Sequence, residues 1–252
     1  MKNNSHIFVG IPVLNRADLL ARCLAHIDVP ATVVIVNNNR NDFQFEDDVD
    51  ALAARHGALV LKQERNLGVS ASWNLIIRTA EKLGFDEYFI GSNDTALTPG
   101  SLAAADAFPK EHDVAIWHLM GFSFFLLNRT TIERVGWFDE NFYPAYKEDQ
   151  DYAYRCHLAG LRRVDVPTAG GDHVGSATIK SNPLYHARND RTHFDWNMNH
   201  YRMKWGEDAD HEKFLHPYND PTKDLRWWPD PGGSIEARDW DNGDFEQRLR
   251  LH

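Results

Sequence analysis

The chain has 252 residues, of which 42% are hydrophobic and 25% charged, a composition typical of a globular protein with a full core. Its formal net charge of -10 argues against broad binding to nucleic acid or anionic membranes, both of which require basic surface. The two cysteines, Cys23 and Cys156, are too few for a disulfide framework and fall at apolar helical positions, so we expect reduced, buried thiols.

The start of the sequence contains no recognisable targeting segment. Residues 1–5 lead directly into an apolar strand, without the apolar stretch of a secretory signal. No apolar run approaches the roughly 18 residues that are needed to span a bilayer. We therefore expect a cytoplasmic protein without a membrane span.

Apolar strands alternate with amphipathic helices in the first part of the chain. The predicted strands cover residues 6–11, 31–36 and 58–61, and the predicted helices cover about 19–27 and 45–56. Pro12 is expected to end the first strand. The first two strands are apolar runs of the kind found in sheets that are buried on both faces. This β-α-β-α-β order predicts a parallel sheet with right-handed crossovers.

The stretch 88–94 reads as a further buried strand that ends in small polar residues and the carboxylate of Asp94. Open α/β sheets bind their ligands at the carboxyl ends of the strands. Polar clusters also follow the first two strands, at 15–16 and 37–42, so we expect three polar strand ends to meet at one edge of the sheet. Such a convergence is what a nucleotide site needs. The alternative is that Asn93 and Asp94 merely form a turn.

Gly68 precedes a helix that holds Trp73 and Asn74. A helix that starts at a glycine can present free N–H groups to an anion. A P-loop is not indicated, because no Lys-Ser or Lys-Thr pair follows. The three spaced glycines of a dinucleotide-binding fingerprint are also absent after the first strand, which argues against a classical NAD-binding domain.

The middle of the chain continues the alternation of helices and strands. The pattern predicts helices over 99–107, up to 135 and over 147–159, and strands at 113–117, 122–127 and 161–166. An aromatic loop is expected at 136–142. Thr98 is the predicted N-cap of the first of these helices, with Pro99 at its first helical position. In the last helix Asp149 shares the spacing of apolar residues up to Cys156, which predicts an inward carboxylate. Glu148 and Asp151 fall on a neighbouring face, where acids compensate the helix dipole.

His173 stands in a glycine-rich loop. A lone histidine is usually structural, but glycines beside it let a ligand approach the backbone and favour a binding role. Beyond this loop aliphatic runs become rare, and we expect a helix over 189–204 and an irregular aromatic tail from residue 217. The pattern predicts a catalytic domain over 1–180 and an extension over 181–252 that packs on it.

The motifs along about residues 6–180, taken together and in the order in which they occur, resemble those of glycosyltransferase family 2. The matching segments are 11–16, 34–39, Asn66-Leu67-Gly68 with Asn74, Ser92-Asn93-Asp94, 136–140, Glu148-Asp149-x-Asp151 and His173. Asn37 stands where the family usually has an aspartate that contacts the base, and Ser92 stands where its metal motif has a first acid. The resemblance implies the GT-A fold, an α/β fold with a Rossmann-like, mixed and mainly parallel sheet flanked by helices, here with an aromatic-rich C-terminal extension.

The resemblance also implies the roles of individual residues. The residues that would contact the nucleotide sugar are Pro12, Asn15, Arg16, Asn37, Asn39, Asn66, Gly68, Asn74, Ser92 and Asn93. Asp94 and His173 would hold Mn²⁺ or Mg²⁺ at the diphosphate. Asp149 would be the catalytic base, and Glu148 would orient the acceptor. Trp117, His118 and Trp137 are candidates for the sugar pocket.

The implied reaction is an inverting, metal-dependent transfer from a nucleoside-diphosphate sugar, with a UDP-sugar favoured, to a hydroxyl of a glycan or another acceptor. A nucleotidyltransferase uses a similar sheet, but its Gly-rich loop with Arg and Lys is not visible after the first strand. A degenerate sugar-nucleotide or glycan binder is the other alternative, because Asn37 and Ser92 replace acids. Asp94, Asp149 and His173 argue for catalysis, since a binder has no use for a buried base.

Overall fold

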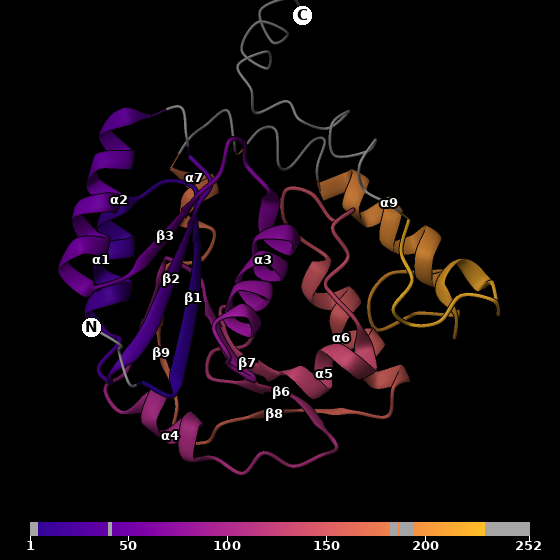
Figure 1. Cartoon of the computed structure of the whole chain (residues 1–252). Coiled ribbons are helices and arrows are strands. Elements are labelled where there is room, and N and C mark those ends of the chain that lie inside the picture. The colour runs from indigo at the N-terminus through magenta and orange to yellow at the C-terminus, as the bar shows by residue number, and fades with distance from the viewer. Residues whose placement is uncertain (1–4, 40–41, 182–185, 187–193, 230–252) are drawn as a thin grey trace, which may run out of the picture.

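The computed structural model describes residues 5–39, 42–181, 186 and 194–229, and its centre is a seven-stranded sheet (Figure 1). The strand order is β3-β2-β1-β4-β7-β6-β8. The strands are β1 (Ile7–Val13), β2 (Ala31–Asn37), β3 (Leu59–Lys62), β4 (Glu87–Gly91), β6 (Val114–His118), β7 (Phe124–Asn128) and β8 (Arg162–Asp165). Within this sheet β7 alone runs antiparallel to its neighbours β4 and β6. The predicted mixed and mainly parallel sheet is therefore confirmed.

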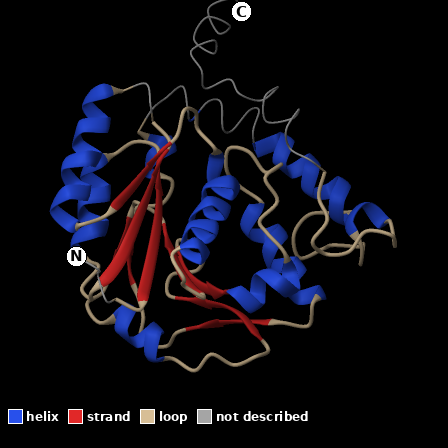
Figure 2. Cartoon of the chain, viewed as in Figure 1, coloured by secondary structure: helices blue, strands red, loops and turns tan. Residues whose placement is uncertain are grey.

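Helices cover both faces of the sheet, and a small second sheet lies beside it (Figure 2). The helices are α1 (Ala17–Ala25), α2 (Phe43–His56), α3 (Gly68–Lys82), α4 (Ser101–Ala107), α5 (Arg129–Val135), α6 (Glu148–Leu158), α7 (Ala177–Lys180) and α9 (Phe194–Trp205), with a 3-10 turn at Pro217–Asn219. The second sheet pairs β5 (Thr95–Leu97) with β9 (Gly171–His173) in antiparallel fashion.

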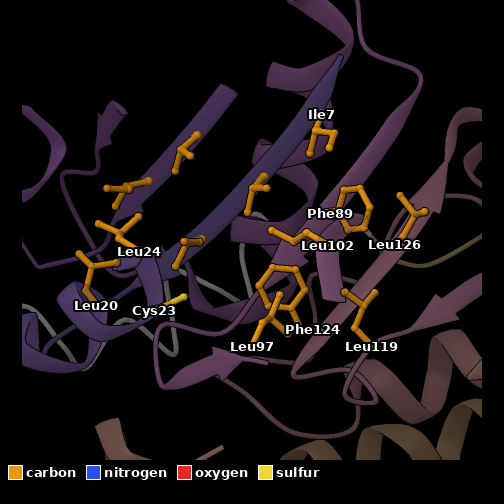
Figure 3. Packing of buried hydrophobic residues seen from close by; sticks show 14 of the residues in the cluster. Ile7, Leu20, Cys23, Leu24, Phe89, Leu97, Leu102, Leu119, Phe124 and Leu126 are labelled. Atoms are coloured by element: carbon orange, nitrogen blue, oxygen red, sulfur yellow. The ribbon is translucent and has the colours of Figure 1, made fainter. Parts of the chain in front are cut away.

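Alternate residues of each central strand enter two separate cores. On one face, Val9 and Phe89 pack with apolar residues of α1, α2 and α4. Figure 3 shows Phe89 of this core together with Leu24 of α1 and Leu102 of α4. On the other face, Phe8 and Ile90 pack with residues of α3, α5 and α6. Because side chains of a strand point alternately to the two faces, an uninterrupted apolar run is what a doubly covered strand requires. The predicted burial of these strands on both faces is confirmed.

Helix α3 lies unusually close to β1. A Cβ atom on Gly10 would lie 2.1 Å from Cγ2 of Ile76, so only glycine leaves room for the helix at this point. The close approach sets the distance between the end of β1 and the start of α3. Both of these segments contribute to the site described below.

The predicted boundaries at Pro12, Thr98 and residue 122 differ from the structure. Pro12 does not end β1 but pairs in register with Val36 near the end of the strand, where the loss of one N–H donor is tolerated. Thr98 is not the N-cap, because α4 starts at Ser101 and Gly100 occupies the N-cap position. The N–H of Thr98 instead continues the pairing of β5 with β9 by donating to the carbonyl of Gly170. The strand expected from residue 122 starts at Phe124, after a turn.

Helix α9 packs against the aromatic loop and α6 through a third apolar cluster that contains Phe142, Tyr201 and Trp205. The indole of Trp205 meets the ring of Tyr154 edge-on, with ring centroids 5.0 Å apart. The helix predicted over 189–204 is described from Phe194 onward, whereas its first residues and the tail beyond 229 lie outside the described residues.

The two thiols are buried and unpaired, as expected. Burial raises the pKa of Cys23 and of Cys156 to about 12, so neither is a thiolate at neutral pH. No helix among the described residues is long and apolar enough to cross a membrane.

Candidate functional site

A cavity of about 480 Å³ opens at the carboxyl ends of β1, β2 and β4. Its wall is formed by Pro12, Val13, Leu14, Asn38, Asn66, Gly68, Val69, Trp73, Ser92, Asn93, Asp94, Met120, Gly121, Phe122, Ser123, Pro144, Ala145, Tyr146, Glu148, Asp149, His173, Ser176 and Ala177. The polar ends of these three strands therefore meet at one place, as the sequence predicts. The loop before α6 closes the cavity on another side.

The small sheet brings Asp94 and His173 together. Asp94 directly precedes β5 and His173 ends β9, and the antiparallel register pairs Thr95 with His173. A Cβ atom on Gly171 would lie 2.4 Å from the carbonyl oxygen of Ala96, so the glycine permits this close pairing. As a result, Nε2 of His173 lies 3.1 Å from Oδ1 of Asp94. The segment around His173, which the sequence predicts as a glycine-rich loop, is therefore a short strand.

Asp94 is almost fully buried, and each of its carboxylate oxygens accepts a hydrogen bond. The Ser92 hydroxyl donates to Oδ1 at 2.6 Å, and the backbone N–H of Ala177 donates to Oδ2 at 3.3 Å. Burial disfavours the charged carboxylate, but the hydrogen bonds from His173 and Ser92 outweigh it and lower the pKa of Asp94 to about 2. The cavity wall therefore contains a negatively charged carboxylate at neutral pH.

His173 is oriented from its other ring nitrogen. Its Nδ1 lies 3.1 Å from the hydroxyl of Ser123. The hydrogen bond with Asp94 raises the pKa of His173, with burial acting in the opposite direction. Because a hydroxyl can donate or accept, Ser123 can satisfy Nδ1 in either tautomer and leave Nε2 directed at Asp94.

The Asp94 and His173 pair suits a divalent cation that is shared with a phosphorylated ligand. Carboxylate oxygen and imidazole nitrogen are ligands for Mn²⁺, and Mg²⁺ commonly binds through one or two carboxylates plus substrate phosphates. Among the described residues no group of three or more His, Cys, Asp and Glu side chains could hold a metal by itself. The pair therefore fits a cation whose remaining ligands come from a diphosphate and water.

Glu148 and Asp149 open helix α6 at the cavity wall. The sequence predicts an inward Asp149 and places Glu148 and Asp151 on a neighbouring face of the helix, where acids compensate the helix dipole. In the structure Asp149 lines the cavity, and the neighbouring face is enclosed as well. Glu148 is 6% exposed and Asp151 is fully buried, whereas Asp149 is only partly buried. The reason is that α6 is covered on two sides, by the sheet and by α9, so the face beside its apolar stripe is also enclosed.

The two carboxyl groups at the start of α6 are desolvated. Burial raises the pKa of Asp149, although the backbone N–H of Gln150 donates to its Oδ1 at 2.8 Å and opposes the shift. Burial and the neighbouring charge of Asp149 raise the pKa of Glu148 well above its ordinary value of 4.5. Oε2 of Glu148 has no hydrogen-bond partner among the described residues. Glu148 is thus suited to carry a proton beside an ionised Asp149.

The segment before α6 rests on the start of α3. The N–H of Val69 donates to the carbonyl of Pro144 at 2.7 Å, and the hydroxyl of Tyr143 donates to the carbonyl of Asn66 at 3.3 Å. Gly68 has a φ of 77°, and a Cβ atom there would lie 2.8 Å from the ring of Tyr143 and 2.9 Å from the carbonyl oxygen of Pro144. Glycine is required at this point by both the backbone angle and the contact.

Of the fourteen residues predicted for the nucleotide sugar, the metal, the base and the orientation of the acceptor, nine line the cavity and five do not. The nine are Pro12, Asn66, Gly68, Ser92, Asn93, Asp94, Glu148, Asp149 and His173, and the others are Asn15, Arg16, Asn37, Asn39 and Asn74. The fully buried Asn74 instead exchanges hydrogen bonds with the backbone of Phe138 and donates to Glu140. Asn15 accepts a hydrogen bond from Asn93 through its carbonyl, which joins the ends of β1 and β4.

Asn38, rather than its two neighbours, faces the cavity after β2. Its side chain accepts from the N–H of Leu67 and donates to the hydroxyl of Ser72, both at 3.0 Å. Asn37 is turned away and accepts the N–H of Asn39. The run of three asparagines signals a polar strand end, but the exact end of the strand decides which of them faces the cavity.

The aromatic wall of the cavity is formed by Trp73 and Phe122, whose rings stack with centroids 6.2 Å apart. The predicted sugar-pocket residues Trp117, His118 and Trp137 do not line the cavity. Trp117 is fully buried and donates to the carbonyl of Pro109. The sequence gives no signal for Phe122, because this residue reads as part of the following strand, whereas it belongs to the turn before β7.

Comparison with known proteins identifies the fold. No family model matches the chain. The structure of GalNAc-T7 with UDP, GalNAc and Mn²⁺ aligns with a TM-score of 0.56 and 13% identity over 78% of this chain and 49% of that chain. The structure of residues 1–349 of S. aureus TarS with UDP aligns with a TM-score of 0.51 and 17% identity over 77% of this chain and 72% of that chain.

These neighbours are GT-A-type glycosyltransferases, and the protein has their fold. In addition, 39 residues, or 16% of the chain, are 51% identical to a galactofuranosyl glycosyltransferase of Leishmania donovani. The match covers 9% of that protein, and the alignment with GalNAc-T7 covers about half of that chain. The resemblance to GT-A glycosyltransferases that the motifs indicate is confirmed at the level of the fold.

Gly68→Ala is expected to destabilise the protein more than Gly57→Ala. Both glycines have a positive φ, but a Cβ atom on Gly57 meets nothing within 4 Å. Gly57→Ala should cost about 1–2 kcal/mol from the backbone alone. Gly68→Ala should cost roughly 1–3 kcal/mol more, because the added methyl overlaps the segment before α6. Urea unfolding of both variants tests this, and equal losses would contradict the close contact.

Glu148→Gln is expected to raise the melting temperature at pH 8 and to change it little at pH 4. The pKa of Glu148 is higher in the folded protein than in the unfolded chain. Its contribution to the free energy of unfolding is therefore fully present at low pH and is lost as the pH rises through the folded-state pKa. Glutamine remains neutral throughout. The exposed Glu133 on α5 provides the matched control, Glu133→Gln. A pH-independent effect of Glu148→Gln on thermal unfolding would show that Glu148 is not desolvated.

Proposed function

We propose that the protein is an inverting, metal-dependent glycosyltransferase that moves a sugar from a nucleoside-diphosphate sugar to an acceptor hydroxyl. One observation carries the proposal: the Asp94 and His173 pair and the carboxylate of Asp149 line the same cavity. A cation site and a base are thus available to one bound donor and one acceptor. GalNAc-T7 and TarS have been solved with UDP, which favours a UDP-sugar as the donor.

In this proposal the donor lies along the carboxyl ends of the parallel strands. Pro12, Asn66, Gly68 and Asn93 line that part of the cavity and would contact the nucleotide. Asn38 joins them, because its amide is already fixed by Leu67 and Ser72 and can present an edge of defined orientation. Because the side chain is already held in place, binding the nucleotide would cost little conformational entropy at this residue.

Asp94 and His173 would hold the cation at the diphosphate. A bound divalent cation would neutralise the charge that develops on the departing nucleoside diphosphate. Ser92 keeps Asp94 oriented, and Ser123 keeps His173 oriented. The four side chains form a short chain of hydrogen bonds, so the two ligands need little rearrangement when the cation binds.

Asp149 would accept the proton of the acceptor hydroxyl as the new carbon–oxygen bond forms and the bond to the nucleoside diphosphate breaks. Displacement from the opposite side of the anomeric carbon gives inversion. Glu148 would keep its own proton, because burial and the charge of Asp149 raise its pKa, and it would donate a hydrogen bond to the acceptor. The stacked wall of Trp73 and Phe122 suits the apolar C–H face of a sugar.

The donor is identified by screening a panel of nucleotide sugars by thermal shift and donor hydrolysis, with Mn²⁺ and with EDTA. We expect stabilisation and slow hydrolysis with a UDP-sugar and Mn²⁺, and loss of both with EDTA. Stabilisation by a glycan without a response to any nucleotide sugar would support the alternative of a degenerate binding protein.

Asp94→Asn and His173→Ala are expected to weaken Mn²⁺-dependent binding of UDP by about 10-fold or more each. Each removes one of the two protein ligands. Asp172→Asn is the matched control, because this exposed carboxylate is adjacent to His173 on β9 and pairs with Arg22 outside the cavity. Calorimetric titration with UDP measures the effect. Equal affinity of the Asp94 and His173 variants and the control would refute the metal site.

Asp149→Asn is expected to lower kcat by about 10²–10⁴-fold while the affinity for UDP and Mn²⁺ stays unchanged. The control is Asp47→Asn, a change of an exposed carboxylate on α2. In the unmodified protein, activity should be present above the pKa of Asp149 and fall as the pH drops through it. Because burial raises this pKa, the acid limb should lie above the pH at which an ordinary aspartate titrates. Near wild-type transfer by Asp149→Asn would exclude this base.

A further inference from the structure

The backbone directly before Glu148 has a conformation that most residues avoid. Tyr146 and Lys147 have φ angles of 79° and 75°, in the left-handed region, and neither is glycine. Such a residue is less stable than one in an ordinary conformation, because its Cβ atom comes too close to the following carbonyl oxygen. A strained turn persists only where the surrounding structure holds it, and strain of this kind concentrates at functional sites.

Asn197 of α9 contacts this turn from outside the cavity wall. Its Nδ2 donates to the carbonyl of Ala145 at 2.7 Å and to the carbonyl of Tyr146 at 3.1 Å. The side chain is fully buried. Two carbonyls of successive residues can accept from one amide group only when they point to the same side, so the two hydrogen bonds favour the turned backbone over an extended one.

Buried charges fix the position of α9 along the turn. Nζ of Lys204 lies 2.8 Å from Oδ2 of Asp139 and 2.7 Å from Oδ1 of Asp151, and all three side chains have no exposed surface. The indole of Trp205 also donates to Oδ1 of Asp151, at 2.8 Å. His200 lies 3.1 Å from Asp139.

These contacts allow α9 only one register. A shift along its axis by one residue would remove Lys204 from both carboxylates and leave buried charges unpaired, which is strongly unfavourable. Burial opposes the charge on Asp139, but Lys204 and His200 keep the pKa of Asp139 well below its usual range. The ion pairs therefore place Asn197 opposite the turn, and Asn197 holds the turn.

We propose that Asn197 is a positioning residue that holds the left-handed turn at Tyr146 and Lys147 so that Glu148 and Asp149 face the cavity. The inference rests on the proposed function, because it assigns a role in presenting the base. Asn197 itself does not line the cavity, and it acts through the backbone. The geometry at the start of α6 is thus held by a side chain of α9.

The first test compares Asn197→Ala with Asn199→Ala. Asn199 has the same side chain on the same helix but is exposed, so its change controls for composition and helix propensity. Asn197→Ala should lower kcat by about 10-fold or more, because a small displacement of a base is costly, while the affinity for UDP and Mn²⁺ is kept. Asn199→Ala should match the wild type. A parallel loss of kcat and UDP affinity would show a general structural role and overturn the proposal.

A second variant separates the strain from other effects of Asn197. A glycine at position 147 adopts a positive φ without strain, so in Lys147→Gly the turn depends less on the hydrogen bonds from Asn197. In the Lys147→Gly background, Asn197→Ala should therefore cost less kcat than in the wild type. An equal cost in both backgrounds would overturn the proposal even if Asn197→Ala is less stable.

Hydrogen exchange tests the restraint independently of activity. Backbone amides of residues 145–149 should exchange faster in Asn197→Ala than in Asn199→Ala, with α1 and α2 unchanged. Unchanged exchange in the turn would refute the restraint. If the wild type binds no nucleotide sugar, the proposed function fails, whereas the exchange comparison still decides whether Asn197 orders the turn.

Discussion

The carboxylate of Asp94 is kept ionised in the cavity wall by groups from separate stretches of the chain. Ser92 donates from the same turn, His173 arrives through the pairing of β5 with β9, and the backbone of Ala177 donates from the start of α7. Burial alone would favour the protonated form, so the carboxylate stays charged only because these hydrogen bonds converge on it. The close pairing that Gly171 permits therefore also helps to keep Asp94 charged, because it brings His173 within hydrogen-bond distance.

A single carboxylate occupies a place where the family resemblance implies two. Ser92 stands at the position of the first acid, and its hydroxyl donates to Asp94. It therefore orients the remaining carboxylate without adding a second negative charge, and it avoids the repulsion that raises the pKa of one of two adjacent acids. A cation bound by Asp94 and His173 would keep more of its positive charge for a diphosphate. The substitution is compatible with a metal site that is completed by the ligand.

The sequence predicts the sheet and its polar edge well, because both depend on short-range patterns. Apolar runs identify the strands, and the polar residues that follow them must meet where parallel strands end. Which residue faces the cavity depends on single-residue shifts, so Asn38 rather than Asn37 lines it. The burial of Asp151 on the neighbouring face of α6 does not follow from the sequence, for another reason. The partner of Asp151 is Lys204, and no local pattern links two residues so far apart in the chain.

The same long-range pairing bears on the division of the chain near residue 180, which stays a prediction. Lys204 shares two carboxylates with the preceding part of the chain, and all three groups are buried. Removing one partner of a buried ion pair is strongly destabilising, because it leaves a desolvated charge without compensation. Asp139 lies in the aromatic loop and Asp151 in α6, so loss of α9 would disturb both segments beside Glu148 and Asp149. The stability of the segment that carries Glu148 and Asp149 therefore depends on α9, even though the change in composition suggests a boundary before this helix.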